Sequence, residues 1–269
     1  MTAAAAALTN EAASVEAVPS HPVLSIDGLS KAFGGIDAVH KVSFTVAAGE
    51  LVALIGPNGA GKTTCFNLVN GQLVPDAGTI ALSGSRIDGL PPRAIARLGV
   101  GRTFQVAATF ASMSVRENVQ LALLAHADAH ESVAARATDR MGDQADALLE
   151  RVRMTKFAGA GCATLAYGDA KRVELALALA GDPRLLLMDE PTAGMSPRSR
   201  DRLMQLAADL AREKKIAVLF TEHDMDVVFG HADRIIVLDR GRLIAEGSPA
   251  AIRADPTVQA VYLGVDDAR

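Results

Sequence analysis

The sequence predicts an α/β fold that combines a parallel core sheet, an N-terminal antiparallel β-subdomain and a helical subdomain. The runs VLSIDGLS and KVSFTV, within residues 23–46, are β-rich and alternate apolar with polar residues, as antiparallel strands do. Later runs (LVALI, LLLM, IAVLF and IIVL) are apolar throughout, which is typical of parallel strands buried on both faces. Between residues 106 and 172 the pattern becomes helical, so a helical insert interrupts the α/β core.

The composition of the chain limits the classes of protein to which it can belong. Its 269 residues are 49% hydrophobic and 22% charged, which predicts a globular protein with a sizeable core. The net charge of −4 argues against a nucleic-acid partner. Two cysteines, Cys65 and Cys162, are too few for a disulfide framework and suggest a reducing compartment. No apolar run approaches the ~20 residues of a membrane span, so we expect a chain that does not cross a membrane by itself.

Five segments follow from these patterns. The first 22 residues are rich in alanine and contain no lysine or arginine, so they predict a disordered leader rather than a secretory signal. We expect the remaining boundaries as follows: the antiparallel sheet and first part of the core at 23–105, the helical subdomain at 106–172, the second part of the core at 173–245, and a C-terminal tail at 246–269.

Three helices are predicted within these segments, and local motifs mark the starts of two of them. Ser114 and Glu117 have the spacing of a capping box, which predicts a helix over VRENVQLALL. Ser196 followed by Pro197 predicts the start of another helix, with proline at its first position. The run DQADALLERVRM is also helical in pattern, whereas residues 126–142 predict a loop or a weak helix.

The stretch GPNGAGKTT matches the phosphate-binding pattern G-x-x-x-x-G-K-[ST] completely. An apolar strand precedes it and a helix-compatible run follows it, which disfavours the alternative of a chance glycine-rich turn. Lys62 is expected to meet the terminal phosphates, Thr63 to ligate Mg²⁺ and Thr64 to reach an inner phosphate. The predicted nucleotide-binding residues of this loop are Gly56, Pro57, Asn58, Gly59, Ala60, Gly61, Lys62, Thr63 and Thr64.

Acidic and amide side chains follow other predicted strands. Asp189 and Glu190 end the run RLLLMDE, at the edge of a parallel sheet where ligands bind. We expect Asp189 to hold the metal and Glu190 to polarise an attacking water, against the alternative of an ordinary acidic strand exit. His223 ends a further strand and is expected near the γ-phosphate. Gln105 ends VGRTF, where its amide can contact Mg²⁺ or the water.

A second anion site is suggested by LAYGDA, residues 165–170, which lies just before a long run rich in alanine and leucine. A glycine at the start of a helix exposes free N–H groups and the positive end of the helix dipole. The alternative is that Gly168 only forms the turn that starts the helix.

Together these motifs resemble the ATP-binding subunit of ABC transporters, over nearly the whole chain from about residue 23. In that resemblance Gly56–Thr64 is the Walker A loop, Gln105 the Q-loop glutamine and LAYGD the signature. Residues 185–190 are the Walker B strand, His223 is the switch histidine and AGMS occupies the D-loop. The resemblance places Phe33 where an aromatic ring stacks on adenine, although Phe33 is also compatible with a core position in the small sheet.

The resemblance implies ATP hydrolysis with ATP and Mg²⁺ as cofactors. It also implies that two subunits pack head to tail, so that Ala166, Tyr167 and Gly168 would serve the nucleotide on the partner. Three positions depart from the family pattern. Ala166 lacks the usual hydroxyl, Asp169 replaces an amide, and Ser196 replaces the usual D-loop aspartate.

The motifs YGD, EHDMDVVF and EGSPAAIRADP are most similar to the ATPases of branched-chain amino acid importers and their relatives. This likeness implies a second ATP-binding subunit, membrane permeases and, indirectly, an extracytoplasmic solute-binding protein, with this chain peripheral on the cytoplasmic face of the membrane. The permease contact is expected at the helical insert and the Gln105 loop. The run VAATFASMSV, residues 106–115, has apolar residues on which a permease helix could dock, and the alternative is that the monomer itself buries them. A cytosolic ABC ATPase that acts in cofactor assembly is the alternative function.

Overall fold

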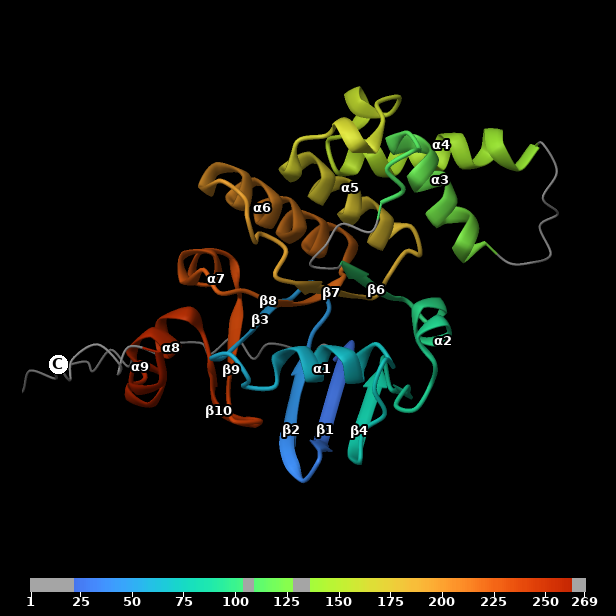
Figure 1. The fold of residues 1–269 in the computed structure, drawn as a ribbon. Helices are drawn as coiled ribbons and strands as arrows, with labels where there is room; N and C mark the ends of the chain where they lie inside the picture. Colours follow the sequence, from blue (N-terminus) through green and yellow to red (C-terminus); the bar gives the residue numbers. More distant parts are fainter. Residues whose placement is uncertain (1–21, 104–108, 128–135, 263–269) are drawn as a thin grey trace, which may run out of the picture.

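The structure is a computed structural model that describes residues 22–103, 109–127 and 136–262 (Figure 1). Gln105 and all of the predicted leader except residue 22 therefore fall outside the described residues. So do residues 106–108 of the expected permease segment, 128–135 of the expected loop or weak helix, and 263–269 of the expected tail.

A six-stranded sheet forms the centre of the molecule, with the strand order β10-β9-β3-β8-β7-β6. Strand β3 pairs in parallel with both β8 and β9, and β7 pairs in parallel with β6 and β8, while β10 is antiparallel to β9. All five residues of β3 are buried, as the apolar sequence LVALI predicts. The strands are β3 (Leu51–Ile55), β6 (Val100–Thr103), β7 (Leu185–Asp189), β8 (Ala217–Thr221), β9 (Arg234–Asp239) and β10 (Arg242–Gly247).

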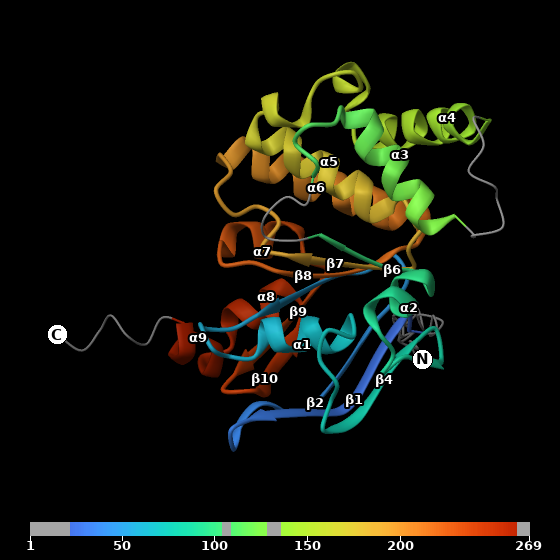
Figure 2. The same cartoon turned by 45° about the vertical axis from the view of Figure 1, so that its right-hand side comes forward.

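A second, four-stranded sheet has the order β2-β1-β4-β5 and is antiparallel, as predicted for the N-terminal runs. Helix α1 (Lys62–Val69) lies between the two sheets in both views (Figures 1 and 2). Apolar residues of both sheets pack with Phe66 of α1 in one buried cluster. The strands of this sheet are β1 (Leu24–Phe33), β2 (Ile36–Val46), β4 (Ala77–Leu82) and β5 (Ser85–Arg86).

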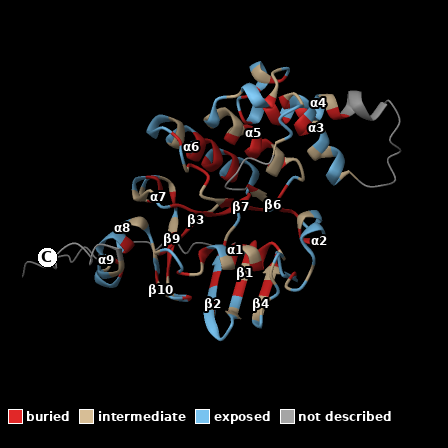
Figure 3. Cartoon of the chain, viewed as in Figure 1, coloured by how far each residue is buried: buried red, intermediate tan, exposed pale blue. Residues whose placement is uncertain are grey.

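Helices α5 and α6 cover the other face of the central sheet, and α3 and α4 pack against α5 on the side away from the sheet (Figure 2). Buried side chains of these four helices join those of β3, β7 and β8 in a second apolar cluster. Figure 3 marks stretches of α5, α6 and the strands below them as buried. Among the described residues, no helix has the length and apolar character that a membrane span requires. The helices are α2 (Pro92–Arg97), α3 (Val115–His126), α4 (Arg136–Arg151), α5 (Tyr167–Leu179), α6 (Pro197–Lys214), α7 (Met225–His231), α8 (Pro249–Ala254) and α9 (Pro256–Tyr262), with 3₁₀ turns η1 (Thr155–Phe157) and η2 (Cys162–Thr164).

The predicted helix starts are confirmed where local side-chain chemistry determines them. The Glu117 amide donates to Ser114 Oγ at 3.2 Å and the Ser114 amide donates to Glu117 Oε2 at 2.7 Å, which completes the capping box of α3. Ser196 and Pro197 start α6 as expected, with proline at the first turn.

The boundary of α5 needs a correction. LAYGDA was expected just before the helix, but α5 begins at Tyr167, so Gly168 is its second residue and not a turn residue. The amides of Asp169 and Ala170 already donate to the Ala166 carbonyl, at 2.9 Å and 3.0 Å. Ala166 is the N-cap and makes no side-chain cap, because alanine has no acceptor atom.

Candidate nucleotide site

The phosphate-binding loop connects β3 to α1, and close backbone approaches require its glycines. A Cβ added at Gly56 would lie 2.3 Å from the Leu238 carbonyl oxygen, in β9. Gly61 is the N-cap of α1 at φ +104°, and a Cβ there would lie 2.3 Å from the carbonyl oxygen of Ala38, in β2. The loop is therefore wedged between the two sheets, and side chains at these positions would displace it.

Lys62 lies inside this loop and is almost completely buried, with 8% of its surface exposed. Its Nζ donates to the Gly56 carbonyl at 2.6 Å and to the Pro57 carbonyl at 3.2 Å. Burial lowers the pKa of the Lys62 ammonium, while the charges of Glu190 and Asp189 oppose this shift. The ammonium thus faces the concave side of the loop, where it can exchange loop carbonyls for phosphate oxygens.

A pocket of about 330 Å³ opens beside the loop and brings the predicted residues of three segments together. Glu190 follows β7 and His223 follows β8, and both strands end at the same edge of the sheet as β3. The residues that line the pocket are Ala38, Asn58, Gly59, Ala60, Gly61, Lys62, Thr63, Thr64, Glu190 and His223.

Glu190 and His223 contact each other in this pocket, with 2.7 Å between Oε1 and Nε2. Glu190 has a left-handed backbone, φ +46°, which is unfavourable for a residue with a Cβ. Its amide donates to the carbonyl and to the hydroxyl of Thr221, at 3.2 Å and 3.1 Å. The end of β8 therefore holds the Glu190 backbone in this conformation.

A buried glutamate that the sequence reasoning missed fixes the segment around His223. Glu222 is 4% exposed, and its Oε1 accepts from the amide and the hydroxyl of Thr192, at 2.8 Å and 2.6 Å. Its Oε2 accepts from the His223 amide at 3.2 Å. Glu222 thus joins the segment after β7 to the segment after β8. The sequence pattern that could have indicated Glu222 is an acidic residue beside a candidate histidine at the end of a buried strand.

Asp189 lies at the end of β7, next to the pocket residue Glu190. The Thr221 hydroxyl donates to its Oδ1 at 2.9 Å, and the guanidinium of Arg102 donates to its Oδ2 at 3.2 Å. The sequence reasoning missed both partners, although an arginine inside the β-rich run VGRTF was a visible signal. The fourth predicted residue at the sheet edge, Gln105, lies outside the described residues.

The donor chemistry near the loop fits a magnesium ion that is shared with a nucleotide. Within the described ranges, no three acidic, histidine or cysteine side chains converge as a metal site of their own. Mg²⁺ in nucleotide sites usually takes only one or two protein oxygens and receives the rest from phosphates and water. The Asp189 carboxylate and the Thr63 hydroxyl are oxygen donors of the kind that such a site needs.

The signature residues lie away from this pocket. None of residues 165–170, all of which are described, lines it. Tyr167 is 48% exposed, whereas Asp169 forms an ion pair with Arg172 on the same helix. The start of α5, which has no side-chain cap, is therefore not part of the pocket beside the chain's own phosphate loop.

Phe33 ends β1 in the small sheet and has 47% of its surface exposed. The alternative of a core position is therefore wrong. The Lys31 ammonium lies 5.7 Å from the centre of the Phe33 ring. Stacking on adenine stays a prediction, because Phe33 does not line the phosphate pocket.

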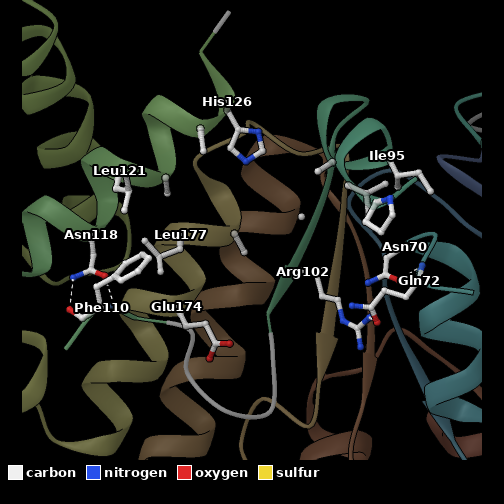
Figure 4. A pocket seen from close by; sticks show the side chains of 17 residues that line it. Asn70, Gln72, Ile95, Arg102, Phe110, Asn118, Leu121, His126, Glu174 and Leu177 are labelled. Carbon is white, nitrogen blue, oxygen red and sulfur yellow. Dashed lines mark hydrogen bonds between the residues drawn. The ribbon is translucent and has the colours of Figure 1, made fainter. Parts of the chain in front are cut away.

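A larger cavity, which we call the apolar groove, lies between α2 and β6 on one side and α3 and α5 on the other (Figure 4). Its volume is about 530 Å³. Phe110, from the segment expected to meet the permease, borders it together with Leu121 and Leu177. Residues 106–108 of that segment lie outside the described residues. Arg102 and Glu174 bring charge into the groove.

A glycine-rich loop joins the parallel strand β3 to a helix, and an acidic pair stands at the end of β7, with β8 between the two strands in the same sheet. This arrangement defines the class of P-loop ATPases. The family follows from comparison with known proteins: residues 39–193 match the family model described as ABC transporter, and the chain belongs to this family. It is an ATPase subunit of the ABC type. Residues 242–268 also match the model of the branched-chain amino acid ATP-binding cassette transporter.

Relatives and solved structures agree with this assignment. The chain is 41% identical over 252 residues to the high-affinity branched-chain amino acid transport ATP-binding protein BraF of Pseudomonas aeruginosa, covering 91% of this chain and 99% of that protein. It is 40% identical to LivG of Escherichia coli K12, a protein of the same description, with the same coverage of both chains. A crystal structure of an ABC transporter cassette in its ADP conformation superposes with a TM-score of 0.80 at 28% identity, covering 90% of this chain and 99% of that one.

Proposed function

We propose that this subunit energises the import of branched-chain amino acids, or of a related small polar solute, through a separate membrane permease. The similarity to BraF and LivG and the C-terminal match support this solute class. In this proposal the subunit is peripheral on the cytoplasmic face of the membrane. Its partners are a second ATP-binding subunit, the permease and, indirectly, an extracytoplasmic solute-binding protein.

The proposed mechanism of ATP hydrolysis is supported by one observation: Lys62, Glu190 and His223 line the same pocket. The phosphates of ATP occupy the loop, where Lys62 and the loop amides neutralise their charge. Glu190 accepts a proton from the attacking water, and His223 orients that carboxylate through the 2.7 Å contact. Thr63, Asp189 and Gln105 would hold Mg²⁺, which would supply positive charge beside the phosphates. Thr64 contacts an inner phosphate.

The start of α5 completes the site of a second subunit. Ala166 leaves the first helical N–H groups without a side-chain cap, so Tyr167 and Gly168 present free donors and the helix dipole to an anion. The exposed position of Tyr167, away from the chain's own phosphate pocket, supports a role in a head-to-tail dimer. ATP binding would then close two subunits around two nucleotides.

The apolar groove is the proposed docking site of a cytoplasmic helix of the permease. It is bounded by the core through β6 and by the helical subdomain through α3 and α5, so an occupant contacts both parts. Phe110 and Leu121 remain 57% and 38% exposed there, which suits the apolar face of a helix.

The experiment is a gene deletion in the native host, complemented with the wild-type chain or with Glu190→Gln. Uptake of labelled leucine, isoleucine, valine and urea is measured, together with the distribution of the subunit between membrane and soluble fractions. We expect the deletion to abolish uptake of one of these solutes, with recovery only from the wild-type chain, and the subunit in the membrane fraction. Unchanged uptake with the subunit only in the soluble fraction would favour a cytosolic assembly ATPase instead.

A further inference from the structure

Arg102 is a charged residue near the end of the partly buried strand β6, and its side chain contacts two sites. Its side chain is only 10% exposed. From β6, its guanidinium contacts Asp189 at the end of β7. Arg102 also lines the apolar groove, where Figure 4 draws its side chain. The same side chain therefore lies between the groove and the aspartate that is proposed to hold the metal.

Side chains near the end of α1 fix the position of this guanidinium. Its Nη1 donates to Asn67 Oδ1 at 2.9 Å and to Gln72 Oε1 at 3.3 Å. The guanidinium carbon lies 6.0 Å from the centre of the Phe66 ring. These contacts hold Arg102 against the helix that follows the phosphate loop. The guanidinium therefore has a fixed position relative to the Asp189 carboxylate.

We propose that Arg102 is a positioning residue that restrains the Asp189 carboxylate and weakens the binding of Mg²⁺ at the ATP site. This inference rests on the proposed function, because it takes Asp189 as the metal-holding residue. Arg102 donates to Oδ2 and the Thr221 hydroxyl donates to Oδ1, so a metal bound by this carboxylate would share its oxygens with one positively charged donor and one neutral donor.

Electrostatics sets the direction of the effect. A fixed positive charge 3.2 Å from the carboxylate opposes the approach of a divalent cation to the same oxygen atoms. The pair is mostly buried, at 10% and 16% side-chain exposure, so solvent screens this opposition less than on a surface. Removal of the charge should therefore strengthen Mg²⁺ binding, whereas damage to a merely structural residue should weaken it.

The test measures equilibrium binding of a fluorescent ATP analogue at increasing Mg²⁺ concentration, in a Glu190→Gln background that blocks hydrolysis. Arg102→Gln is expected to lower the half-saturating Mg²⁺ concentration by about fivefold. Binding of the analogue in EDTA should stay the same or weaken, because a positive charge near the phosphates is lost. Arg102→Met removes the charge but keeps the apolar stem, and serves if the glutamine variant does not fold. Both variants are checked by circular dichroism and thermal melting.

Two controls sharpen the comparison. Arg102→Lys keeps the charge and should behave like the parent protein. Arg116→Gln removes an arginine paired with Asp146 on the helical subdomain, at 46% and 42% side-chain exposure, and should leave the Mg²⁺ requirement unchanged. An unchanged or higher half-saturating Mg²⁺ concentration in the folded uncharged variants would overturn the role of Arg102 alone. A parent protein that binds no nucleotide at all would overturn the proposed function, and this inference with it.

Discussion

The imidazole of His223 and the carboxylate of Glu190 meet at 2.7 Å, although 33 positions separate them in the chain. Each follows a strand of the central sheet, and the neighbouring strands β7 and β8 pair in parallel register from Leu185 with Ala217 to Asp189 with Thr221. The register brings their carboxyl ends to the same level, and the Thr221 contacts with the Glu190 amide turn that residue toward the phosphate loop.

Glu190→Gln should bind ATP with near-normal affinity but hydrolyse it about 10²–10⁴-fold more slowly, since the amide cannot accept the proton of the attacking water. Steady-state phosphate release and equilibrium ATP binding measure the two effects. Lys62→Ala is the contrasting variant, because it should lose ATP affinity instead. Near-normal turnover by Glu190→Gln would refute the assignment of Glu190 as the general base.

Phe33→Ala should raise the ATP dissociation constant by about 5- to 150-fold, the equivalent of one stacked base. Because Phe33 is 47% exposed in the native protein, the melting temperature of the Phe33→Ala variant should hardly change. Phe66→Ala is the matched control: that ring is fully buried in α1, so its loss should cost about 3–5 kcal/mol of unfolding free energy. Intact ATP affinity in a folded Phe33→Ala protein would exclude adenine stacking.

Gly168→Asp should leave ATP binding by the monomer almost unchanged but prevent the ATP-bound dimer, because a carboxylate at the start of α5 repels the partner's γ-phosphate. Size-exclusion chromatography with ATP and Mg²⁺ in the Glu190→Gln background reports dimerisation, with a heteromeric second ATPase present if one is required.

Gly168→Ala is the control for this experiment, since an added Cβ would meet only Met195 Cε at 3.4 Å and Ser199 at 3.5 Å, which are ordinary contacts. Ala166→Ser, which restores the hydroxyl usual in the signature, should tighten the dimer. Normal dimerisation of Gly168→Asp would contradict a role for this segment in the partner's site.

Cys65 should resist alkylation in the native protein at pH 8. Burial raises the pKa of its thiol to about 12, so the reactive thiolate is on the order of 10⁻⁴ of the population at that pH. Iodoacetamide labelling followed by mass spectrometry of peptides tests this, with the protein in denaturant as the positive control. Labelling of native Cys65 at the rate of a free cysteine would show that α1 opens readily.

Much of the site could be predicted from the sequence, because short local motifs determine it. The phosphate loop, the capping box of α3 and the start of α6 each depend on residues a few positions apart, and the structure places all three as expected. The start of α5 was less well determined, because Ala166 carries no capping side chain to mark it. Gln105 and the predicted domain boundaries remain predictions.

The sequence by itself determined which functional residues follow which buried strand along the chain: a phosphate loop after one, acids after another and a histidine after a third. Only the tertiary structure decided which side chains meet, because parallel strands are paired through distant residues whose register no local pattern encodes. Thus Thr221 reaches Asp189 from β8, Glu222 ties Thr192 to the His223 backbone, and Arg102 reaches Asp189 from β6. Apart from the bond between the adjacent residues Glu222 and His223, these contacts join residues at least 30 positions apart, and the packing of the central sheet creates them.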